Sequence, residues 1–347
     1  MQSEVTRRNG AAGAVYVQTN EAGCNRLLAF ERGSDGALKL AGAYETGGAG
    51  DGVPHLTSQG SVVLTGDGRY VLVTNVGSGD VSVFAVGETG PVLSQTVASG
   101  NAPKSVAEHE GLVYVLNTGD PSITGFRLAA ERAEPLAGSS RDLAANADPA
   151  QVGFSRDGTM LVVTERGTDG IVAYPVDARG HLGEPHRSPS SGPTPYGFAF
   201  TRRGSLVVTE AFGAQVGKAA ASTYVVGSDG VDPVSRSVGN GRSEICWAVV
   251  TDDDRYAFAT NFGDGAVSRY AIAADGSLAL EDAAAGMAVK GHTGLRDEAL
   301  SDGDDFLYAI DADSRRVFGW AVADDGSLEP IGSWDGLPAT VAGLAAS

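Results

Sequence analysis

The residues best suited to chemistry in this sequence are basic side chains in glycine-containing segments. His55 lies in GDGVPHLTSQG, His292 and Arg296 lie in KGHTGLRDE, and Lys104 lies in GNAPKS. Histidine exchanges a proton near neutral pH, whereas arginine and lysine bind carboxylates. If the fold brings these residues together, they predict a site for proton transfer on a small anionic molecule. The alternative is that the fold keeps them apart, in which case each is a solvated loop residue.

A second candidate group surrounds Glu244, which is followed by Cys246 and Trp247 in SEICW. A carboxyl group that is partly withdrawn from water has a raised pKa and suits general acid/base catalysis. The alternative is a rim carboxylate that binds backbone N–H groups. Tyr196 and Trp247 are expected either to form an aromatic wall for a ligand or to plug a channel. Cys246 could be a nucleophile, but no histidine follows it at a spacing characteristic of a catalytic pair. We therefore interpret Cys246 as a small buried residue.

The elements that must position these residues are seven similar repeats. Each contains an apolar run, a polar turn and a second run that ends in Asn, Glu or Asp. The run ends recur every 42 to 55 residues, at Asn20, Asn75, Asn117, Glu165, Glu210, Asn261 and Asp311. Periods of this length with several short strands each are typical of propeller blades. The sequence therefore predicts an all-β fold, a seven-bladed β-propeller.

The first repeat differs from the others because it begins near Gly13 and lacks an inner strand. A matching strand stands at the other end of the sequence, as TVAGLAAS in residues 340–347. We expect this C-terminal strand to complete the N-terminal blade, since closure removes the open edges of a linear array. Residues 1–12 are expected to form a flexible N-terminal tail, and residues 13–347 a single propeller domain.

The loops that enter the inner strands and those from second to third strands lie on one side of a propeller, called the ligand face below. The candidates fall on this face, and we expect His55 and Arg296 to approach each other across the channel mouth. The run-end residues form a polar ring there. Because Asn and Asp also cap tight turns, Glu165 and Glu210 are the members expected to bind substrate, with His292 nearby. Such a ring of oxygen atoms also suits Ca²⁺ or Mg²⁺.

The composition narrows the class of partner. The chain has 25 Lys and Arg against 43 Asp and Glu, for a formal net charge of −18, so we expect neither nucleic acid nor membrane as partner. Two cysteines do not make a disulfide scaffold, and no apolar run has the length of a signal peptide or membrane span. We expect a cytoplasmic monomer or weak homodimer that binds a small-molecule substrate without a cofactor. The lack of a His/Cys cluster predicts no transition metal.

Four segments carry a resemblance to a known family. They are GSVVLTGDGRYVLVTNVGSGDVSVF from Gly60, DPAQVGFSRDGTMLVVTE from Asp148, SGPTPYGFAF from Ser191 and SEICWAVVTDDDRYAFATNFGDGAVSRY from Ser243. Together they resemble the lactonase family of seven-bladed propellers, which includes 6-phosphogluconolactonases and 3-carboxy-cis,cis-muconate lactonising enzymes, often called 3-carboxymuconate cyclases. The resemblance covers nearly the whole chain, and it implies that Glu244 is the acidic site residue.

The chain also departs from that family. Where active members typically carry an Arg-His pair this chain has Pro195 and Tyr196, and where they tend to carry Asn-Arg it has Asn261 and Phe262. The resemblance thus implies a divergent branch that couples proton transfer to ring formation or opening in a small cyclic or carboxylate-bearing metabolite. Glu244 would be the acid/base, with His55 as a second catalytic candidate, and Arg296 or Lys104 would orient the substrate.

Two other interpretations stay open. One is a metal-dependent hydrolase that resembles gluconolactonase propellers, with the run-end ring as metal ligands. The other is a non-catalytic propeller that serves as an interaction platform, because a fold does not determine a function.

Overall fold

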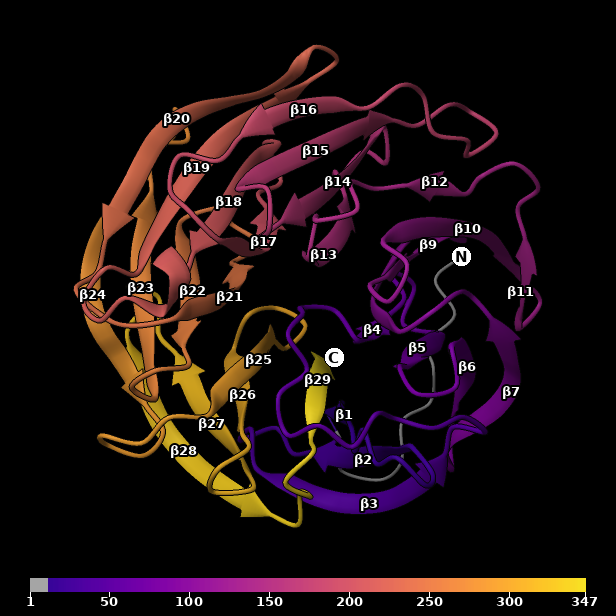
Figure 1. Ribbon diagram of the computed structural model, residues 1–347. Coiled ribbons are helices and arrows are strands. Elements are labelled where there is room, and N and C mark those ends of the chain that lie inside the picture. Colours follow the sequence, from indigo (N-terminus) through magenta and orange to yellow (C-terminus); the bar gives the residue numbers. More distant parts are fainter. Residues whose placement is uncertain (1–11) are drawn as a thin grey trace.

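The computed structural model describes residues 12–347, which form a ring of seven antiparallel sheets (Figure 1). The predicted all-β, seven-bladed propeller is confirmed. Blades are numbered here in chain order, and each has an inner strand, a second strand, a third strand and an outer strand. Blade 3 carries one additional short strand, β12, which pairs with its third strand.

The strands of the first three blades, from the inner strand outward, have the following bounds. They are β29 (Ala342–Ala346), β1 (Gly13–Gln18), β2 (Arg26–Arg32) and β3 (Leu38–Glu45) in blade 1; β4 (Val62–Leu64), β5 (Tyr70–Asn75), β6 (Asp80–Gly87) and β7 (Gly90–Ala98) in blade 2; and β8 (Pro103–His109), β9 (Leu112–Asn117), β10 (Ser122–Ala129), β11 (Arg132–Pro135) and β12 (Arg141–Asp142) in blade 3.

The other four blades follow the same order. Their strands are β13 (Pro149–Phe154), β14 (Met160–Glu165), β15 (Gly170–Pro175) and β16 (His186–Pro189) in blade 4; β17 (Pro195–Phe200), β18 (Ser205–Glu210), β19 (Ala220–Gly227) and β20 (Gly230–Gly239) in blade 5; β21 (Ile245–Val250), β22 (Tyr256–Asn261), β23 (Ala266–Ile272) and β24 (Leu278–Met287) in blade 6; and β25 (Leu295–Leu300), β26 (Phe306–Asp311), β27 (Arg316–Val322) and β28 (Leu328–Asp335) in blade 7.

Closure of the ring occurs where the sequence predicts it. β29 pairs antiparallel with β1, so that Val17 lies opposite Leu344 and Val15 opposite Ala346. β29 also contacts the neighbouring inner strands β25 and β4, and successive inner strands contact one another around the ring. The C-terminal strand therefore completes the N-terminal blade and covers the inner edge of β1.

The core lies between the blades. Seven clusters of buried apolar residues each join two neighbouring blades, as with Phe30 and Tyr308 between blades 1 and 7. The second strand of a blade is covered on both faces, which is why β5 and β9 are buried along their whole lengths and read as continuous apolar runs rather than alternating ones. Aspartate-glycine turns join strands on the side opposite the ligand face, and Gly68 and Gly158 there have φ values of 68° and 69°.

Helical structure among residues 12–347 is limited to one short 3₁₀ segment, η1 (Phe212–Ala214). Within that same part of the chain, no helix has the length and hydrophobicity needed to cross a lipid bilayer. The expected N-terminal tail, residues 1–12, lies outside the described residues apart from Ala12.

Candidate functional site

The inner strands of blades 3 to 7 begin alike on the ligand face. The residue before each strand has a positive φ, namely Ala102, Asp148, Thr194, Glu244 and Gly294. Each strand then shows a register shift against its second strand within its first four residues. The second residues of these strands are Lys104, Ala150, Tyr196, Cys246 and Arg296. Three of the predicted site residues therefore occupy one repeated position around the channel mouth.

The mouth is filled by the chain's own segment 54–59, which lies between β3 and β4. The Trp247 indole Nε1 donates a hydrogen bond to the Ser58 carbonyl at 2.8 Å. The Gln59 side-chain amide forms two hydrogen bonds with the backbone of Ala248. Its NH₂ group donates to the Ala248 carbonyl at 2.8 Å, and its oxygen accepts from the Ala248 N–H at 3.0 Å. Below Gln59 the channel opens into a cavity of about 480 Å³ on the opposite side. Segment 54–59 thus separates the mouth from the lower channel.

His55 and Arg296 meet at one aromatic ring in this mouth. The His55 imidazole stacks on Phe262 with ring centroids 4.5 Å apart and planes within 5° of parallel. The Arg296 guanidinium carbon lies 5.2 Å from the centroid of the same ring. Arg296 is 2% exposed, and it donates hydrogen bonds to the carbonyls of Pro54 and Gly294. Phe262, which stands where the family tends to have arginine, is thus the contact that brings the two predicted residues together.

A second basic pair faces the other end of segment 54–59. The Thr57 hydroxyl accepts hydrogen bonds from Lys104 Nζ at 3.5 Å and from Arg166 Nη2 at 3.2 Å. Arg166 also pairs with Asp148 at 2.7 Å and lies over the Tyr196 ring, 5.0 Å from its centroid. The Arg166 side chain is only 14% exposed. The sequence interpretation missed Arg166, which follows the run-end residue Glu165 in the loop from second to third strand.

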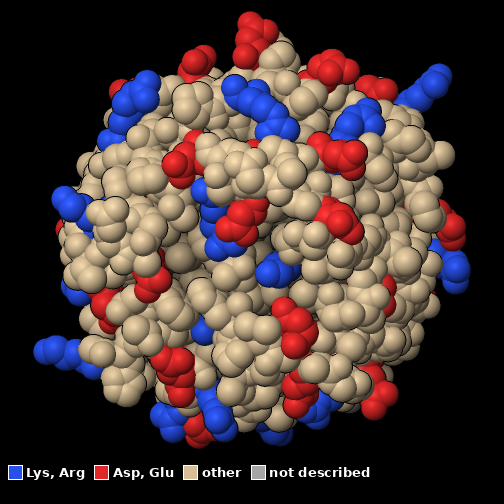
Figure 2. Space-filling model, in the orientation of Figure 1, with Lys and Arg blue, Asp and Glu red and all other residues tan. Residues whose placement is uncertain are grey.

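These cations dominate the electrostatics of the mouth. Burial, together with the positive charges of Arg296, Arg166 and Lys104, lowers the pKa of His55 to about 4. Burial also lowers the pKa values of Lys104 and Arg296. In Figure 2, Lys and Arg side chains lie around the hollowed middle of the ring, with Asp and Glu side chains between and beyond them. A chain with a large negative charge therefore carries a local positive site, and His55 is neutral there at pH 7.

The His55 ring has an unpaired nitrogen. Among residues 12–347, its buried Nε2 atom has no hydrogen-bond partner. A neutral imidazole with an unpaired nitrogen accepts a proton or a hydrogen bond from a ligand. Surrounded by three cations, the same nitrogen is suited to a ligand that brings a negative charge.

Glu244 enters β21 on the ligand face with a φ of 55°. Burial raises the pKa of its carboxyl group. Cys246, one residue into the same strand, is 4% exposed, and burial raises the pKa of its thiol, in keeping with a small buried residue. The rings of Tyr196 and Trp247 lie 5.5 Å apart, and both are buried. These two aromatic side chains form the floor under segment 54–59.

Three other candidates lie away from the mouth. Glu165 is 1% exposed and is held by Arg187 at 2.9 Å and the Thr168 hydroxyl at 2.7 Å. Glu210 accepts hydrogen bonds from the Gly192 N–H and from the hydroxyls of Ser222, Ser237 and Tyr224. Both carboxylates thus bond within their own blades. His292 is exposed in the turn before β25, and the structure does not bring it to His55.

Two buried acids next to Arg296 also escaped the sequence interpretation. Asp297 is 3% exposed, accepts a hydrogen bond from the Gly343 N–H of β29 at 2.9 Å, and has its pKa raised to about 7 by burial. Glu298 accepts from the Thr260 N–H at 3.2 Å, and burial raises its pKa well above the usual value. The sequence signal for these acids is the run Arg296, Asp297 and Glu298, three successive charged residues near the start of the inner strand β25.

The polar ring does not form a metal cluster in the described part of the chain. Among residues 12–347, no group of three or more His, Cys, Asp or Glu side chains is close enough to hold a metal ion. The run-end residues bond instead to neighbouring polar side chains, as Asn75 does when it donates to Asp80 at 2.6 Å and to Ser82 at 2.7 Å and accepts from Asn25 at 2.9 Å. A ligand set for a divalent cation is therefore not assembled there.

The fold and the site together define a closed seven-bladed propeller with a basic centre on its ligand face. The sequence model of the family described as "Lactonase, 7-bladed beta-propeller" matches residues 54–211. This stretch runs from segment 54–59 through blades 2 to 4 and the first two strands of blade 5, and it includes Lys104 and Arg166. The predicted resemblance to the lactonase family is thus confirmed. None of the curated proteins compared with the chain matches it.

Solved structures agree with this assignment at the level of the fold. A functionally unknown protein from Desulfotomaculum acetoxidans has a TM-score of 0.73 and 13% identity, over 96% of this chain and 98% of its own. The periplasmic gluconolactonase of Pseudomonas aeruginosa has a TM-score of 0.71 and 16% identity, over 96% of this chain and 98% of its own. At these sequence identities the similarity establishes the propeller fold, and the function of the site depends on the residues of this chain.

Proposed function

We propose that this protein is an enzyme of the lactonase/cycloisomerase type, acting at the channel mouth on a small anionic metabolite that forms or opens a ring. The observation that carries the proposal is the convergence of Lys104, Arg166 and Arg296 on a neutral His55. The similarity to lactonase-family propellers supports the reaction class. The proposed partner is a small molecule rather than a nucleic acid or membrane, and the proposed location is the cytoplasm.

The three cations have the chemistry to bind a carboxylate or phosphate and to stabilise the charge of an enolate or oxyanion. Such charges are bound strongly because Arg166 and Arg296 are already largely withdrawn from water. The His55 nitrogen would accept a hydrogen bond or a proton from the substrate. A bound anion would raise the pKa of this imidazole, since it offsets the cations that lower it.

Glu244 is proposed as the general acid/base. A left-handed backbone costs a residue other than glycine about 1 to 2 kcal/mol, and blade 7 has Gly294 at the equivalent position. The backbone therefore does not require glutamate there. The raised pKa of this carboxyl makes it a better proton donor near neutral pH than an ordinary surface carboxylate.

Segment 54–59 occupies the positions that ligand oxygen atoms would take. The Pro54 carbonyl lies on Arg296, and the Thr57 hydroxyl lies between Lys104 and Arg166. A substrate anion would replace these oxygens, so productive binding would displace segment 54–59 from the cations. This exchange of one set of hydrogen bonds for another keeps the buried charges satisfied throughout.

The test is turnover of a panel that contains glucono-δ-lactone, 6-phosphoglucono-δ-lactone and 3-carboxy-cis,cis-muconate. Glu244→Gln should lower kcat about 100-fold or more with little change in KM, because a positioned acid/base contributes at that scale. Lys104→Met should mainly raise KM for the anionic members. Glu21→Gln, at a half-buried carboxylate paired with Arg26, is the matched control and should leave both constants unchanged.

One observation favours a second function. Because segment 54–59 fills the mouth, the same cations suit a protein that binds an anionic metabolite without converting it. In that case calorimetry should detect carboxylate or phosphate binding that Lys104→Met weakens, while no member of the panel is turned over. If the parent does turn over a member of the panel, full activity in Glu244→Gln would remove the acid/base assignment.

A further inference from the structure

Neighbouring inner strands are tied together by side chains at one repeated position. In β8, the hydroxyl of the third residue, Ser105, accepts a hydrogen bond from the Val152 N–H at 3.2 Å. In β13, the side-chain amide of the third residue, Gln151, accepts from the Phe198 N–H at 2.6 Å and donates to the Phe198 carbonyl at 3.1 Å. Val152 and Phe198 are each the fourth residue of the next inner strand. In blades 3 and 4, the third residue of the inner strand therefore binds the backbone of the following blade.

Blade 5 does not make this connection with a side chain of its own. The third residue of β17 is Gly197, and a β carbon there would lie 2.5 Å from the Cys246 carbonyl oxygen of β21. Gln59 supplies the connection instead, from outside the blades. It makes with Ala248, the fourth residue of β21, the same two hydrogen bonds that Gln151 makes in blade 4. Its side-chain oxygen occupies the space that a β carbon of Gly197 would need, so the segment in the mouth is fastened where blade 5 lacks a side chain.

Glycine residues stand on either side of segment 54–59. Gly52 has a φ of 71° and Gly60 a φ of 81°, and glycine adopts these and many other backbone angles without strain. Between them, the side chain of Leu56 is buried, and the Ser58 hydroxyl donates to a backbone carbonyl of β8 at 2.7 Å. The two glycines allow the chain to change direction at both ends of the segment while the blades stay in place.

We propose that Gln59 is a positioning residue that holds segment 54–59 in the mouth and thereby limits the affinity of the mouth for anions. This inference rests on the proposed anion site at Lys104, Arg166 and Arg296. The segment and an anion compete for the same cations, so an anion binds only to the fraction of molecules in which the segment has left them. The hydrogen bonds of the Gln59 side chain form only while the segment is in place, and they reduce that fraction.

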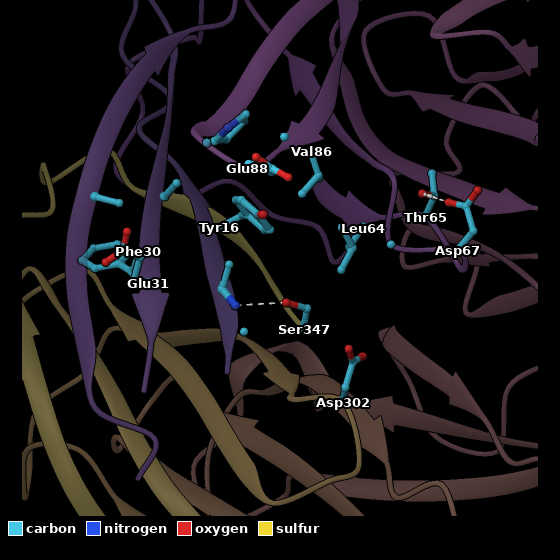
Figure 3. A pocket seen from close by; sticks show the side chains of 18 of the residues that line it. Tyr16, Phe30, Glu31, Leu64, Thr65, Asp67, Val86, Glu88, Asp302 and Ser347 are labelled. Carbon is cyan, nitrogen blue, oxygen red and sulfur yellow. Dashed lines mark hydrogen bonds between the residues drawn. The ribbon is translucent and has the colours of Figure 1, made fainter. Parts of the chain in front are cut away.

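A second hollow of the ring does not depend on segment 54–59. It is a cleft of about 330 Å³ between blades 1 and 2, on the side opposite the ligand face, and Figure 3 shows Tyr16, Leu64 and Val86 around its middle. Small residues form much of its walls, namely Ala14, Ala29, Ala41, Gly66 and Gly87. Among the described residues that line this cleft, none belongs to segment 54–59. Release of the segment therefore changes the mouth and leaves the cleft as it is.

The first experiment measures anion affinity in matched variants. Inorganic phosphate is titrated by calorimetry into the full chain, Gln59→Ala and Gln151→Ala. Gln59→Ala should bind phosphate about tenfold more tightly than the parent, because two hydrogen bonds that favour the closed mouth are lost. Gln151→Ala loses the same two bonds between blades 4 and 5 without removing any bond of segment 54–59, and it should bind phosphate as the parent does.

The outcomes separate this inference from the proposed function. Equal or weaker phosphate binding by Gln59→Ala overturns the inference and leaves the proposed anion site in place. Binding that tightens to the same extent in Gln151→Ala also overturns it, because the ring would then have loosened in general. Absence of phosphate binding in all three proteins overturns both the inference and the proposed anion site.

A second measurement follows the segment itself. The Trp247 indole is fully buried, and its N–H donates to the Ser58 carbonyl. NMR with a neutral paramagnetic agent measures the solvent access of each indole N–H. The agent should attenuate the Trp247 signal when the parent is saturated with phosphate, and in Gln59→Ala it should do so without phosphate. Trp320, buried between blades 6 and 7, is the internal reference and should stay unchanged. A Trp247 signal that stays protected in both cases overturns the proposal.

Discussion

The channel mouth and the cleft between blades 1 and 2 are opposites in charge and in filling. The mouth gathers Lys104, Arg166 and Arg296 around His55, and segment 54–59 fills it with its own oxygens. The cleft is lined by carboxylates and small residues, and its walls leave a volume of about 330 Å³. Both lie in one chain with a net charge of −18. The difference shows that net charge predicts long-range attraction but not what a particular site binds.

The two regions also differ in how the propeller builds them. The basic residues of the mouth come together because they occupy equivalent positions in the repeat. Lys104 and Arg296, for example, are each the second residue of an inner strand. An exception to the repeat creates the cleft, because one pair of blades meets through alanine and glycine instead of large side chains. β29 connects the two, since Gly343 bonds Asp297 beside the mouth and Ser347 lines the cleft.

The largest effect should come from removing that shared strand. Deletion of residues 340–347 exposes the edges of β1 and removes the buried Val341, Ala342 and Leu344 from the core. Each fully buried large apolar side chain contributes about 1.5–3 kcal/mol, and whole domains are stable by only about 5–15 kcal/mol. We expect no cooperative thermal transition in circular dichroism and no ligand binding at the mouth.

A single substitution calibrates this effect. Leu344→Ala keeps the strand and should lower the free energy of unfolding by about 2–5 kcal/mol while leaving a cooperative transition. A truncated protein that melts at the parental temperature would show that the ring does not depend on β29.

The second prediction uses the pH dependence of stability to separate Asp297 from His55. The pKa of Asp297 is raised to about 7, so the unfolded chain loses this proton at lower pH than the folded one, and stability falls between about pH 4 and pH 7. The pKa of His55 is lowered to about 4, so stability rises over about pH 4 to 6.5. The two effects oppose each other in the parent.

Substitution should uncover each of them. Asp297→Asn should gain about 4 kcal/mol relative to the parent between pH 4 and pH 7, the amount that corresponds to the raised pKa. In His55→Gln, the free energy of unfolding should no longer rise between about pH 4 and pH 6.5. Urea unfolding at several pH values measures both changes. A parallel pair of stability curves for Asp297→Asn and the parent would mean that this carboxyl ionises normally in the folded protein.

The third prediction concerns the His55 proton. A carboxylate bound in the mouth should raise the pKa of His55 by about 1 to 3, because an opposite charge at close range has this effect. NMR titration of the histidine ring protons with and without ligand measures it, and the exposed His292 serves as the internal reference. A shift of His292 equal to that of His55 would indicate a general salt effect instead.

The fold was largely predictable from the sequence because the same signal occurs seven times. An isolated run such as YVLVTN is ambiguous, but its recurrence with similar turns indicates blades. The missing inner strand of the first repeat predicted the pairing of β29 with β1, which the structure confirms. The cleft was not predictable, since it depends on which small residues face one another across two blades.

The site was predictable only where position in the repeat determines it. Lys104, Tyr196 and Arg296 share one place in the inner strand, so a correct division into blades puts them on the same face. Arg166 was missed because the reach of a loop side chain across the channel has no local signal. Conversely, Glu165 and Glu210 match the pattern of a ligand ring, yet neighbouring hydroxyls, N–H groups and an arginine already engage them.

The pairing of β29 with β1 also has a consequence for how the protein is made. The bond from the Ala14 N–H to the Ser347 hydroxyl joins positions 333 residues apart. At about 5–20 residues per second, a ribosome needs roughly 20 to 70 s to synthesise the chain between them. During that time the exposed edge of β1 waits without its partner while later blades emerge. Until β29 is made, that edge is open to pairing with a strand of another molecule.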